Sequence, residues 1–255
     1  MTKVVPYKND YILVERNELL SQLILWTSVS ISVATLVISK AQVPFFKETT
    51  ISLLNSINCF LAVVYFVSDI VANYHFQLAE TKRREDFFDN SLNTQLAEAT
   101  SAGYFSNENM NPGILKMGVN NFENSYLSKT VAGRMLQPML IKSALILTLF
   151  LALALFTDRE ILTTALQLVF PFTIIQQTIR LFLYHKRIGN VFKNYQKIFG
   201  STADGKKEQL IIHNMTSYET TLSWACIKLN SNIFNKVNDE LTPKWEAMKQ
   251  KYHIL

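Results

Sequence analysis

The stretch Leu19–Ser39 reads LLSQLILWTSVSISVATLVIS and carries no charged side chain. A second apolar stretch, Ile51–Val71, contains a single charged residue, Asp69, close to its end. Two further apolar stretches follow at Met139–Phe156 and Ile161–Leu183. Each is close to the ~20 residues that an α-helix needs to cross the hydrocarbon core of a bilayer. The pattern therefore predicts four membrane-spanning helices.

The four stretches form two pairs around a large polar segment, which predicts an all-α membrane protein with two transmembrane hairpins. The third stretch is the weakest, and we expect its Lys142 to extend toward the membrane surface. The predicted parts are a cytoplasmic N-terminus at 1–18, hairpin 1 at 19–71, a cytoplasmic helical insert at 72–138, hairpin 2 at 139–183 and a cytoplasmic helical tail at 184–255.

The overall composition hides these stretches, because apolar residues make up 49% of the chain, charged residues 18%, and the mean hydropathy is only +0.11. That average mixes apolar spans with a polar remainder. Met1–Asn17 is mixed in charge, and no small-residue cleavage site follows it. We therefore expect the first span to stay in the chain as a signal anchor.

The basic residues are distributed unevenly around the four stretches. They gather before the first, after the second, before the third and after the fourth, whereas the two short connections are poorer in them. The positive-inside rule then places both termini and the polar middle in the cytoplasm. Because this rule also accounts for the net charge of +5, the expected partner is the lipid bilayer and not a nucleic acid.

Residues suited to catalysis or metal binding are few. The two cysteines, Cys59 and Cys226, cannot form a disulfide framework in a reducing compartment. The four histidines lack the spacing of metal ligands. The chain shows no glycine-rich phosphate loop, no nucleophile elbow and no pair of carboxylates in a recognisable setting. We therefore expect no enzymatic activity, no cofactor and no metal ion.

The insert is expected to begin as a helical extension of the second span, since apolar residues from Tyr74 to Leu96 repeat along one helical face. Between Thr100 and Asn124 this pattern fails, and glycine, asparagine and proline residues indicate turns. Aromatic residues such as Phe122 are interspersed there, which is atypical of a disordered linker. We predict an ordered loop that packs on another part of the protein.

The tail carries apolar residues from Ile211 to Ile233 at steps of three and four, which is typical of one face of a helix. This face either packs on the insert of the same chain or contacts another subunit. The candidate interface residues are Tyr218, Leu222 and Leu229. Farther along, Thr242 and Pro243 predict the start of a short last helix, with Thr as the N-cap and Pro in the first helical position.

Polar residues inside the spans are further candidates, because each costs free energy in lipid unless it faces protein or water. The residues concerned are Asn55, Asn58, Asp69, Gln167, Thr173, Gln177 and Arg180. Such groups commonly join neighbouring membrane helices. Alternatively they line a water-filled path, beside which Pro171 kinks the fourth span. Asp69 and Arg180 either form an ion pair that closes the inner mouth of that path or extend separately into the headgroups.

The segment Arg83-Arg84-Glu85-Asp86-Phe87-Phe88-Asp89 follows the first helix pair. It resembles the acidic-aromatic step that the SMODS-associated four-transmembrane effectors of bacterial anti-phage nucleotide signalling carry there. The segment from Tyr218 to Trp245 is a second, fainter similarity. The arrangement of helices resembles that family over most of the chain, but only a few residues match as a motif.

This resemblance implies an effector that permeabilises or depolarises the bacterial inner membrane when a cytoplasmic signal, such as a cyclic nucleotide second messenger, is sensed. Arg83, Arg84 and Asp89 are then candidate contacts for the signal. Since four modestly polar helices are few for enclosing a conducting path, we expect a homo-oligomer. A rival class is a non-conducting scaffold that recruits a soluble partner through the face around Tyr218. A lipid-modifying enzyme is the least favoured class.

Overall fold

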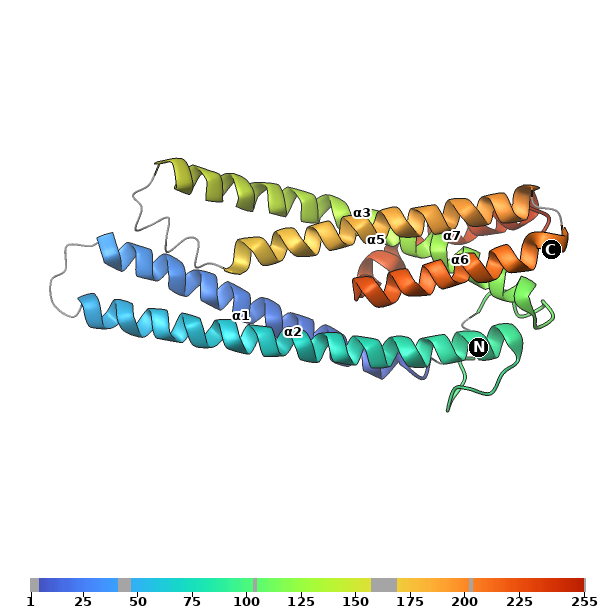
Figure 1. Ribbon diagram of the computed structural model, residues 1–255, viewed down its shortest axis with the longest axis horizontal. Helices are drawn as coiled ribbons and strands as arrows, with labels where there is room; N and C mark the ends of the chain where they lie inside the picture. The colour runs from blue at the N-terminus through green and yellow to red at the C-terminus, as the bar shows by residue number, and fades with distance from the viewer. Residues whose placement is uncertain (1–4, 41–46, 103–104, 157–168, 202–203, 255) are drawn as a thin grey trace. The chain divides into compact units, whose positions relative to one another are not determined.

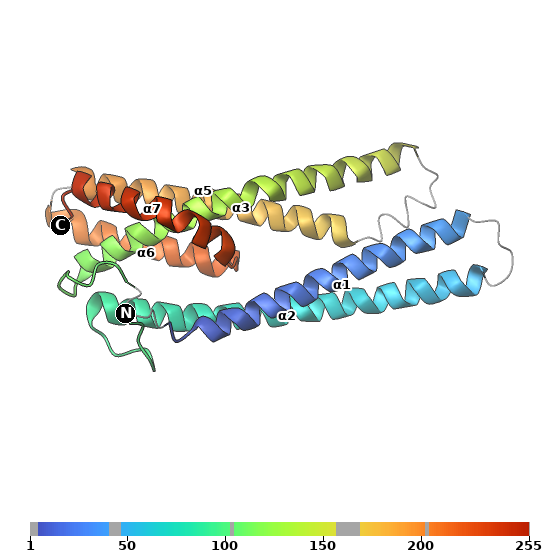
Figure 2. The ribbon, with the colours of Figure 1, turned by 180° about the vertical axis from the view of Figure 1, so that it is seen from behind.

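The computed structural model describes residues 5–40, 47–102, 105–156, 169–201 and 204–254. The elements of regular structure in these residues are α-helices, which confirms the predicted all-α class (Figure 1, Figure 2). They are α1 (Lys8–Lys40), α2 (Lys47–Leu92), α3 (Ile114–Phe156), α5 (Val169–Ser201), α6 (Asp204–Ala225) and α7 (Ser231–Lys251).

The chain folds into two compact units. Unit 1 contains Met1–Tyr11, Phe76–Gln137 and Arg180–Leu255, and unit 2 contains Ile12–His75 and Pro138–Ile179. Unit 2 thus gathers helical segments of both predicted hairpins, whereas unit 1 gathers the insert and the tail together with the start of the chain. The helices α1, α2, α3 and α5 each contribute residues to both units.

Two helical stretches, Lys8–Ser39 and Glu48–Leu92, are long and apolar enough to cross a membrane. Their most apolar 18-residue windows have mean hydropathies of 1.7 and 1.8, and none of the window in α2 is buried inside the protein. The third predicted span falls on the end of α3, and the fourth begins within residues 157–168, which lie outside the described part, and continues into α5. The described residues therefore show two stretches of this kind where the sequence predicts four.

Unit 2 has a small apolar centre to which α1, α2, α3 and α5 all contribute. Leu25 of α1 and Ile174 of α5 are buried against each other. Val29 of α1, Tyr65 of α2 and Ile146 of α3 pack around them. Most other large apolar side chains of unit 2 point outward. Burial inside the unit therefore does not explain why it contains so many apolar residues.

The helix α2 continues well beyond the second apolar stretch, as the sequence predicts, and ends at Leu92. Asn93 follows in a left-handed backbone conformation, with φ of 57°. Its N–H still donates to the carbonyl oxygen of Asp89 at 3.0 Å. Asparagine tolerates this conformation better than most residues, so it is a suitable place for the helix to stop.

Aromatic rings fill the centre of unit 1. Phe122 of α3 is fully buried, and its ring centre lies 5.3–5.7 Å from those of five other rings. These rings belong to Phe192, Tyr195, Phe199, Trp245 and Tyr252, all of the tail. Phe122 of the insert therefore packs on the tail.

The predicted extent of the loop was wrong, because α3 already begins at Ile114 and includes Asn120, Asn121 and Phe122. Side-chain hydrogen bonds explain why asparagine is helical here. The amide of Asn120 donates to Asn90 Oδ1 at 3.0 Å and to Ser91 Oγ at 3.1 Å. These contacts fix α3 to the end of α2 and outweigh the turn propensity of asparagine.

The predicted helix start at Thr242 and Pro243 was also wrong, since both lie inside α7. This helix begins at Ser231, and Asn230 is its N-cap, with Oδ1 accepting from the N–H of Ile233 at 3.0 Å. The hydroxyl of Thr242 donates instead to the carbonyl oxygen of Asn238 at 2.9 Å. Leu241 and Trp245 are buried on either side of the proline, so packing keeps the helix continuous.

Candidate functional site

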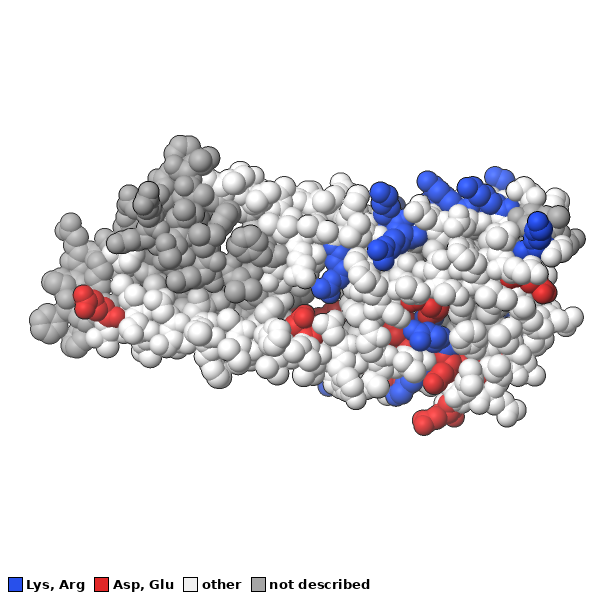
Figure 3. Space-filling view, viewed as in Figure 1, with Lys and Arg blue, Asp and Glu red and all other residues white. Residues whose placement is uncertain are grey.

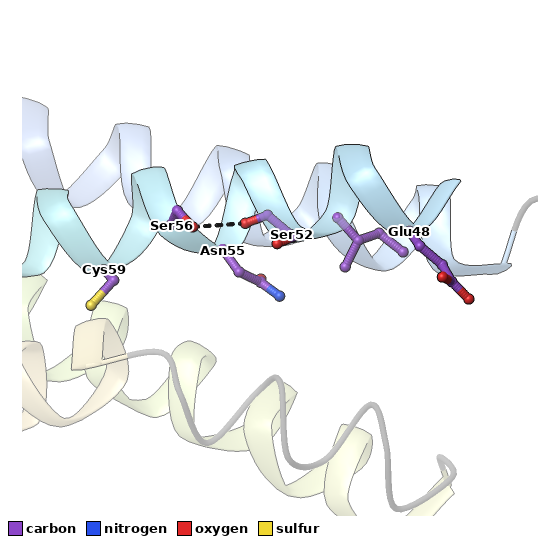
Figure 4. Close-up of a pocket in the computed structure, with 6 residues that line it drawn as sticks. Glu48, Ser52, Asn55, Ser56 and Cys59 are labelled. Atoms are coloured by element: carbon purple, nitrogen blue, oxygen red, sulfur yellow. Dashed lines mark hydrogen bonds between the residues drawn. The ribbon is translucent and has the colours of Figure 1, made fainter. Parts of the chain in front are cut away.

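A shallow groove runs along the start of α2 in unit 2. Its lining residues, called the α2 groove from here on, are Glu48, Ile51, Ser52, Asn55, Ser56 and Cys59. Asn55 and Cys59 extend from the same side of the helix, and the Ser56 hydroxyl donates to the Ser52 carbonyl oxygen at 3.0 Å (Figure 4). Within the described residues the Asn55 side chain makes no hydrogen bond and is exposed. Asn55 is therefore a polar group of the groove that still needs a partner.

Asn58 lies only three residues farther along α2 but faces α1. Its amide nitrogen donates to Ser32 Oγ at 2.8 Å, and its oxygen accepts from the Ser28 hydroxyl. A second link between the same helices joins the hydroxyls of Ser21 and Ser68 at 2.9 Å. Of the two alternatives for the polar span residues, Asn58 therefore follows the one in which they join neighbouring helices.

The polar contact between α3 and α5 is made by Thr178, the neighbour of the predicted residue Gln177. Ser143 Oγ and Thr178 Oγ1 lie 2.6 Å apart, and Thr178 is buried, whereas Gln177 is exposed. Thr173 is half-buried on α5. Gln167 lies outside the described residues, and so does the side chain of Pro171.

The two charged candidates of the spans belong to different units. Asp69 of unit 2 accepts a hydrogen bond from the Asn73 amide at 3.1 Å, one turn farther along α2. Arg180 is the first residue of the tail part of unit 1. Their ion pair stays a prediction.

Lys142 has a partner inside unit 2. Its ammonium nitrogen lies 5.3 Å from the ring centre of Trp26, which is a cation–π contact between α3 and α1. The predicted extension of this lysine toward the membrane surface stays a prediction.

In unit 1 a cluster of four charged residues, called the Glu219 cluster, joins α2 to α6. It consists of Glu80, Arg83, Arg84 and Glu219. Arg83 donates to Glu219 Oε2 at 2.6 Å and to Glu80 Oε2 at 2.9 Å, and Arg84 donates to the same Glu219 oxygen at 3.0 Å. Two candidate signal contacts are thus already engaged by carboxylates of their own chain.

Burial and pairing act in opposite directions on Arg83. Burial by itself would lower the pKa of its guanidinium group, because the charged form loses its hydration. The carboxylates of Glu80 and Glu219 outweigh that effect and raise the pKa well above its ordinary value. Arg83 therefore stays charged inside the protein, and those two carboxylates stabilise the buried charge.

Further contacts hold the same region together. Arg84 also donates to Ser223 Oγ at 3.1 Å, and the Gln77 amide donates to the Ser223 carbonyl oxygen at 3.1 Å. At the start of α1, the Tyr11 hydroxyl donates to Glu80. The Glu219 cluster therefore connects the α1 start, α2 and α6 within unit 1.

Asp89, the third candidate signal contact, instead fixes the loop after α2. Its carboxylate accepts from the Thr94 hydroxyl at 2.7 Å, from the Leu96 N–H at 2.8 Å and from the Ala97 N–H at 2.9 Å. Burial would raise the pKa of Asp89, but these hydrogen bonds outweigh it and lower that pKa. Asp86 binds Ser101 in the same way, through its N–H at 2.7 Å and its hydroxyl at 2.6 Å.

The candidate interface residues of the tail are mostly inside unit 1. Tyr218 and Leu222 are 4% and 7% exposed, and the Tyr218 hydroxyl lies 3.1 Å from Ser128 Oγ of α3. Leu229 lies beyond the end of α6 and packs on a small core around Val131 of α3. The structure thus shows the packing alternative for this face, and no interface is proposed on it.

Glu219 and the serines of α1 are the residues that sequence reasoning did not single out as a site. The partners Arg83 and Glu219 are separated by 136 positions, so no local spacing could reveal them. Ser21, Ser28 and Ser32 recur at steps of seven and four on one helical face, a signal that was present in the sequence.

Within the described residues, no group of three or more His, Cys, Asp or Glu side chains is placed to hold a metal ion. Comparison with known proteins finds no matching family model, no matching curated protein and no matching solved structure.

Proposed function

We propose that the protein is an oligomeric inner-membrane effector that raises membrane permeability, with the α2 groove facing the conducting path and unit 1 controlling it. One observation carries the proposal: within the described residues, the exposed Asn55 amide has no hydrogen-bond partner, although it lies on a helix segment with apolar side chains that point outward. Its neighbours Leu53 and Phe60 are 60% and 67% exposed. Such an apolar surface suits lipid, but an unpartnered amide does not.

Lipid tails offer no hydrogen bonds, so Asn55 needs either water or a group from another protein chain. The hydroxyl of Ser56 is already satisfied within its own helix. Several copies that turn their α2 grooves toward one another would supply both kinds of partner. This arrangement favours a homo-oligomer around a polar path over a lone bundle in lipid.

The cytoplasmic signal remains part of the proposal, supported by the resemblance to the anti-phage effectors. The contacts within unit 1 restrict how such a signal acts. An anionic messenger that bound Arg83 and Arg84 would compete with Glu219, which accepts hydrogen bonds from both side chains. Opening of the Glu219 cluster is therefore the step that we propose for control.

The scaffold alternative is less well supported. It assigned recruitment of a soluble partner to the face around Tyr218, but Tyr218 and Leu222 are buried against other helices of unit 1. A partner that binds this face would first have to separate the packed helices.

A dye-efflux assay on the full chain in liposomes tests the proposal. Wild-type protein is expected to release dye well above protein-free liposomes, and Asn55→Leu is expected to lose most of that release. The matched control is Ser30→Leu, which makes the same polar-to-apolar change at an exposed site on α1 whose hydroxyl bonds its own helix at 3.0 Å. Inserted wild-type protein that releases no dye, or an Asn55→Leu variant that equals wild type, would contradict the proposal.

A further inference from the structure

Exposed basic side chains gather on unit 1 along α5 (Figure 3). The sequence of α5, Val169–Ser201, contains no aspartate or glutamate. Lys186 and Lys193 are exposed, and neither forms an ion pair within the described residues. This face therefore keeps its positive charge and attracts an anionic partner.

A large aromatic ring lies next to the start of this basic face. Trp224, in the last turn of α6, is 45% exposed. The guanidinium carbon of Arg187 lies 4.3 Å from the centre of its ring, which is a cation–π contact. The stacked guanidinium uses its flat face, so its N–H groups at the edge remain able to donate to an anion.

The position of Arg187 in the chain indicates which kind of anionic partner this face binds. Lys186 and Arg187 follow Leu183, the end of the fourth apolar stretch, by three and four residues, which is about 5 Å along a helix. Lys193 follows it by ten residues, or about 15 Å. A half-exposed tryptophan beside basic residues at the edge of an apolar span is typical of the membrane–water interface.

We infer that Lys186, Arg187 and Trp224 form a docking surface for anionic phospholipid headgroups, which holds the end of α6 against the membrane. The guanidinium and ammonium groups donate to phosphate oxygens, and the indole ring lies among the headgroups. This inference rests on the proposed insertion of the protein in a membrane, but not on its permeability function.

Fluorescence quenching tests the docking surface. The full chain is reconstituted in phosphatidylcholine vesicles with or without phosphatidylglycerol, both containing a shallow brominated lipid as quencher. The signal of Trp224 is the difference between wild type and Trp224→Phe, which removes the contribution of Trp26 and Trp245. Quenching of Trp224 is expected to rise at least about twofold with phosphatidylglycerol, because each basic residue near an anionic surface adds favourable binding energy.

Charge variants then distinguish headgroup binding at this surface from a general electrostatic attraction between the protein and the vesicle. Lys186→Glu combined with Arg187→Glu is expected to abolish the phosphatidylglycerol-dependent gain. Lys193→Glu, which makes the same kind of charge change farther from the apolar stretch, is expected to retain it. The milder pair Lys186→Gln and Arg187→Gln is measured as well, with helix content followed by circular dichroism, so that misfolding is not mistaken for lost docking.

Two results would overturn the inference: equal Trp224 quenching in both kinds of vesicle, or a loss with Lys193→Glu as large as with the double variant. Dye efflux from the same vesicles keeps the two proposals apart. Efflux without the lipid-dependent quenching refutes the docking surface alone, and quenching without efflux refutes the permeability function alone.

Discussion

Unit 1 and unit 2 differ in the polar groups that they bury and in how much apolar surface they expose. In unit 1 the charged residues Glu80 and Glu219 are 5% and 7% exposed and aromatic rings fill the centre. In unit 2 the side chains of Leu23, Phe60 and Leu145 are 65–67% exposed, while hydroxyls and an amide meet between helices. A protein in water buries its aromatic rings, as unit 1 does, whereas exposed apolar surface on the scale of unit 2 suits hydrocarbon. The contrast supports different surroundings for the two units.

The same contrast separates two kinds of polar contact. In unit 1 a buried charge is tolerated because ion pairs and hydrogen bonds surround it, so removal of one partner is costly. In unit 2 the polar contacts between helices join neutral groups, and if the unit lies in lipid as proposed, each contributes modestly. The following predictions test this difference, from the largest expected effect to the smallest.

Removal of the central carboxylate of the Glu219 cluster is expected to cost most. Glu219→Leu leaves Arg83 buried with Glu80 alone and deprives Arg84 of its carboxylate. We expect the free energy of unfolding of unit 1 to fall by about 3–5 kcal/mol. Chemical unfolding of the detergent-solubilised protein, followed by circular dichroism, measures it.

The control for this variant is Glu240→Leu, which removes a carboxylate that also pairs with two basic residues, Lys244 and Arg134. Since that pair lies at the surface, only a small change is expected. If both variants lowered the free energy of unfolding equally, burial of the Glu219 cluster would not be the cause of the large loss.

Close packing of α3 on α6 gives the second prediction. A Cβ atom added at Gly118 would lie 2.8–2.9 Å from three side-chain carbons of Ile211. Gly118→Ala is therefore expected to destabilise unit 1 by about 1–3 kcal/mol, and Ile211→Val in the same chain should recover part of that loss. Gly205→Ala is the control, because its Cβ would meet no atom within 4 Å. Failure of Ile211→Val to recover any stability would argue against this helix contact.

Asp89 gives a prediction about pH. Because hydrogen bonds lower its pKa in the folded protein, the unfolded chain binds the proton more readily. Its contribution to the free energy of unfolding is present above its ordinary pKa of 3.8 and is lost as the pH falls through the lowered value. Asp89→Asn should thus cost about 1–2 kcal/mol near neutral pH.

Thermal melting of both proteins across the acidic range measures this dependence. The difference in melting temperature between wild type and Asp89→Asn should shrink as the pH falls below about 4. A difference that stays constant over the whole range would mean that the charge of Asp89 does not hold the loop.

The smallest expected effect lies in unit 2. Asn58→Leu removes two hydrogen bonds between α1 and α2, and we expect a loss of about 0.6–2 kcal/mol in the stability of that helix pair. Asn55→Leu, three residues away, should leave stability unchanged because Asn55 bonds nothing in the described chain. Unfolding in increasing dodecyl sulfate measures both. A larger loss from Asn55→Leu would reverse the roles assigned to the two residues.

The elements that the sequence predicted well are those set by local pattern. Where they are described, the apolar stretches are helical, as predicted, and α2 continues beyond Val71, although it ends at Leu92 and not at the predicted Leu96. The tail face from Ile211 to Leu222 is buried, as its spacing of three and four indicated. Periodicity identifies which side of a helix is covered, although not what covers it.

Contacts between distant parts of the chain explain what the sequence did not predict. Asn120 favours turns by itself, but its bonds to Asn90 and Ser91 keep it helical. Pro243 lies inside α7 because its neighbours are packed in the core. The motif around Arg83 resembled a signal contact, whereas its partner Glu219 is known only once the fold brings α2 and α6 together.

Reactivity of the native thiol at Cys59 tests the central claim most directly. Cys59 lines the α2 groove, and the adjacent Phe60 is 67% exposed on the apolar surface. A charged, membrane-impermeant thiol reagent is applied to liposomes that contain the Cys226→Ser variant, or a Cys59→Ser, Cys226→Ser chain with Phe60→Cys. The account predicts rapid labelling at position 59 and protection at position 60. Labelling of both would contradict insertion of unit 2 in lipid, and protection of both would contradict a water-filled groove.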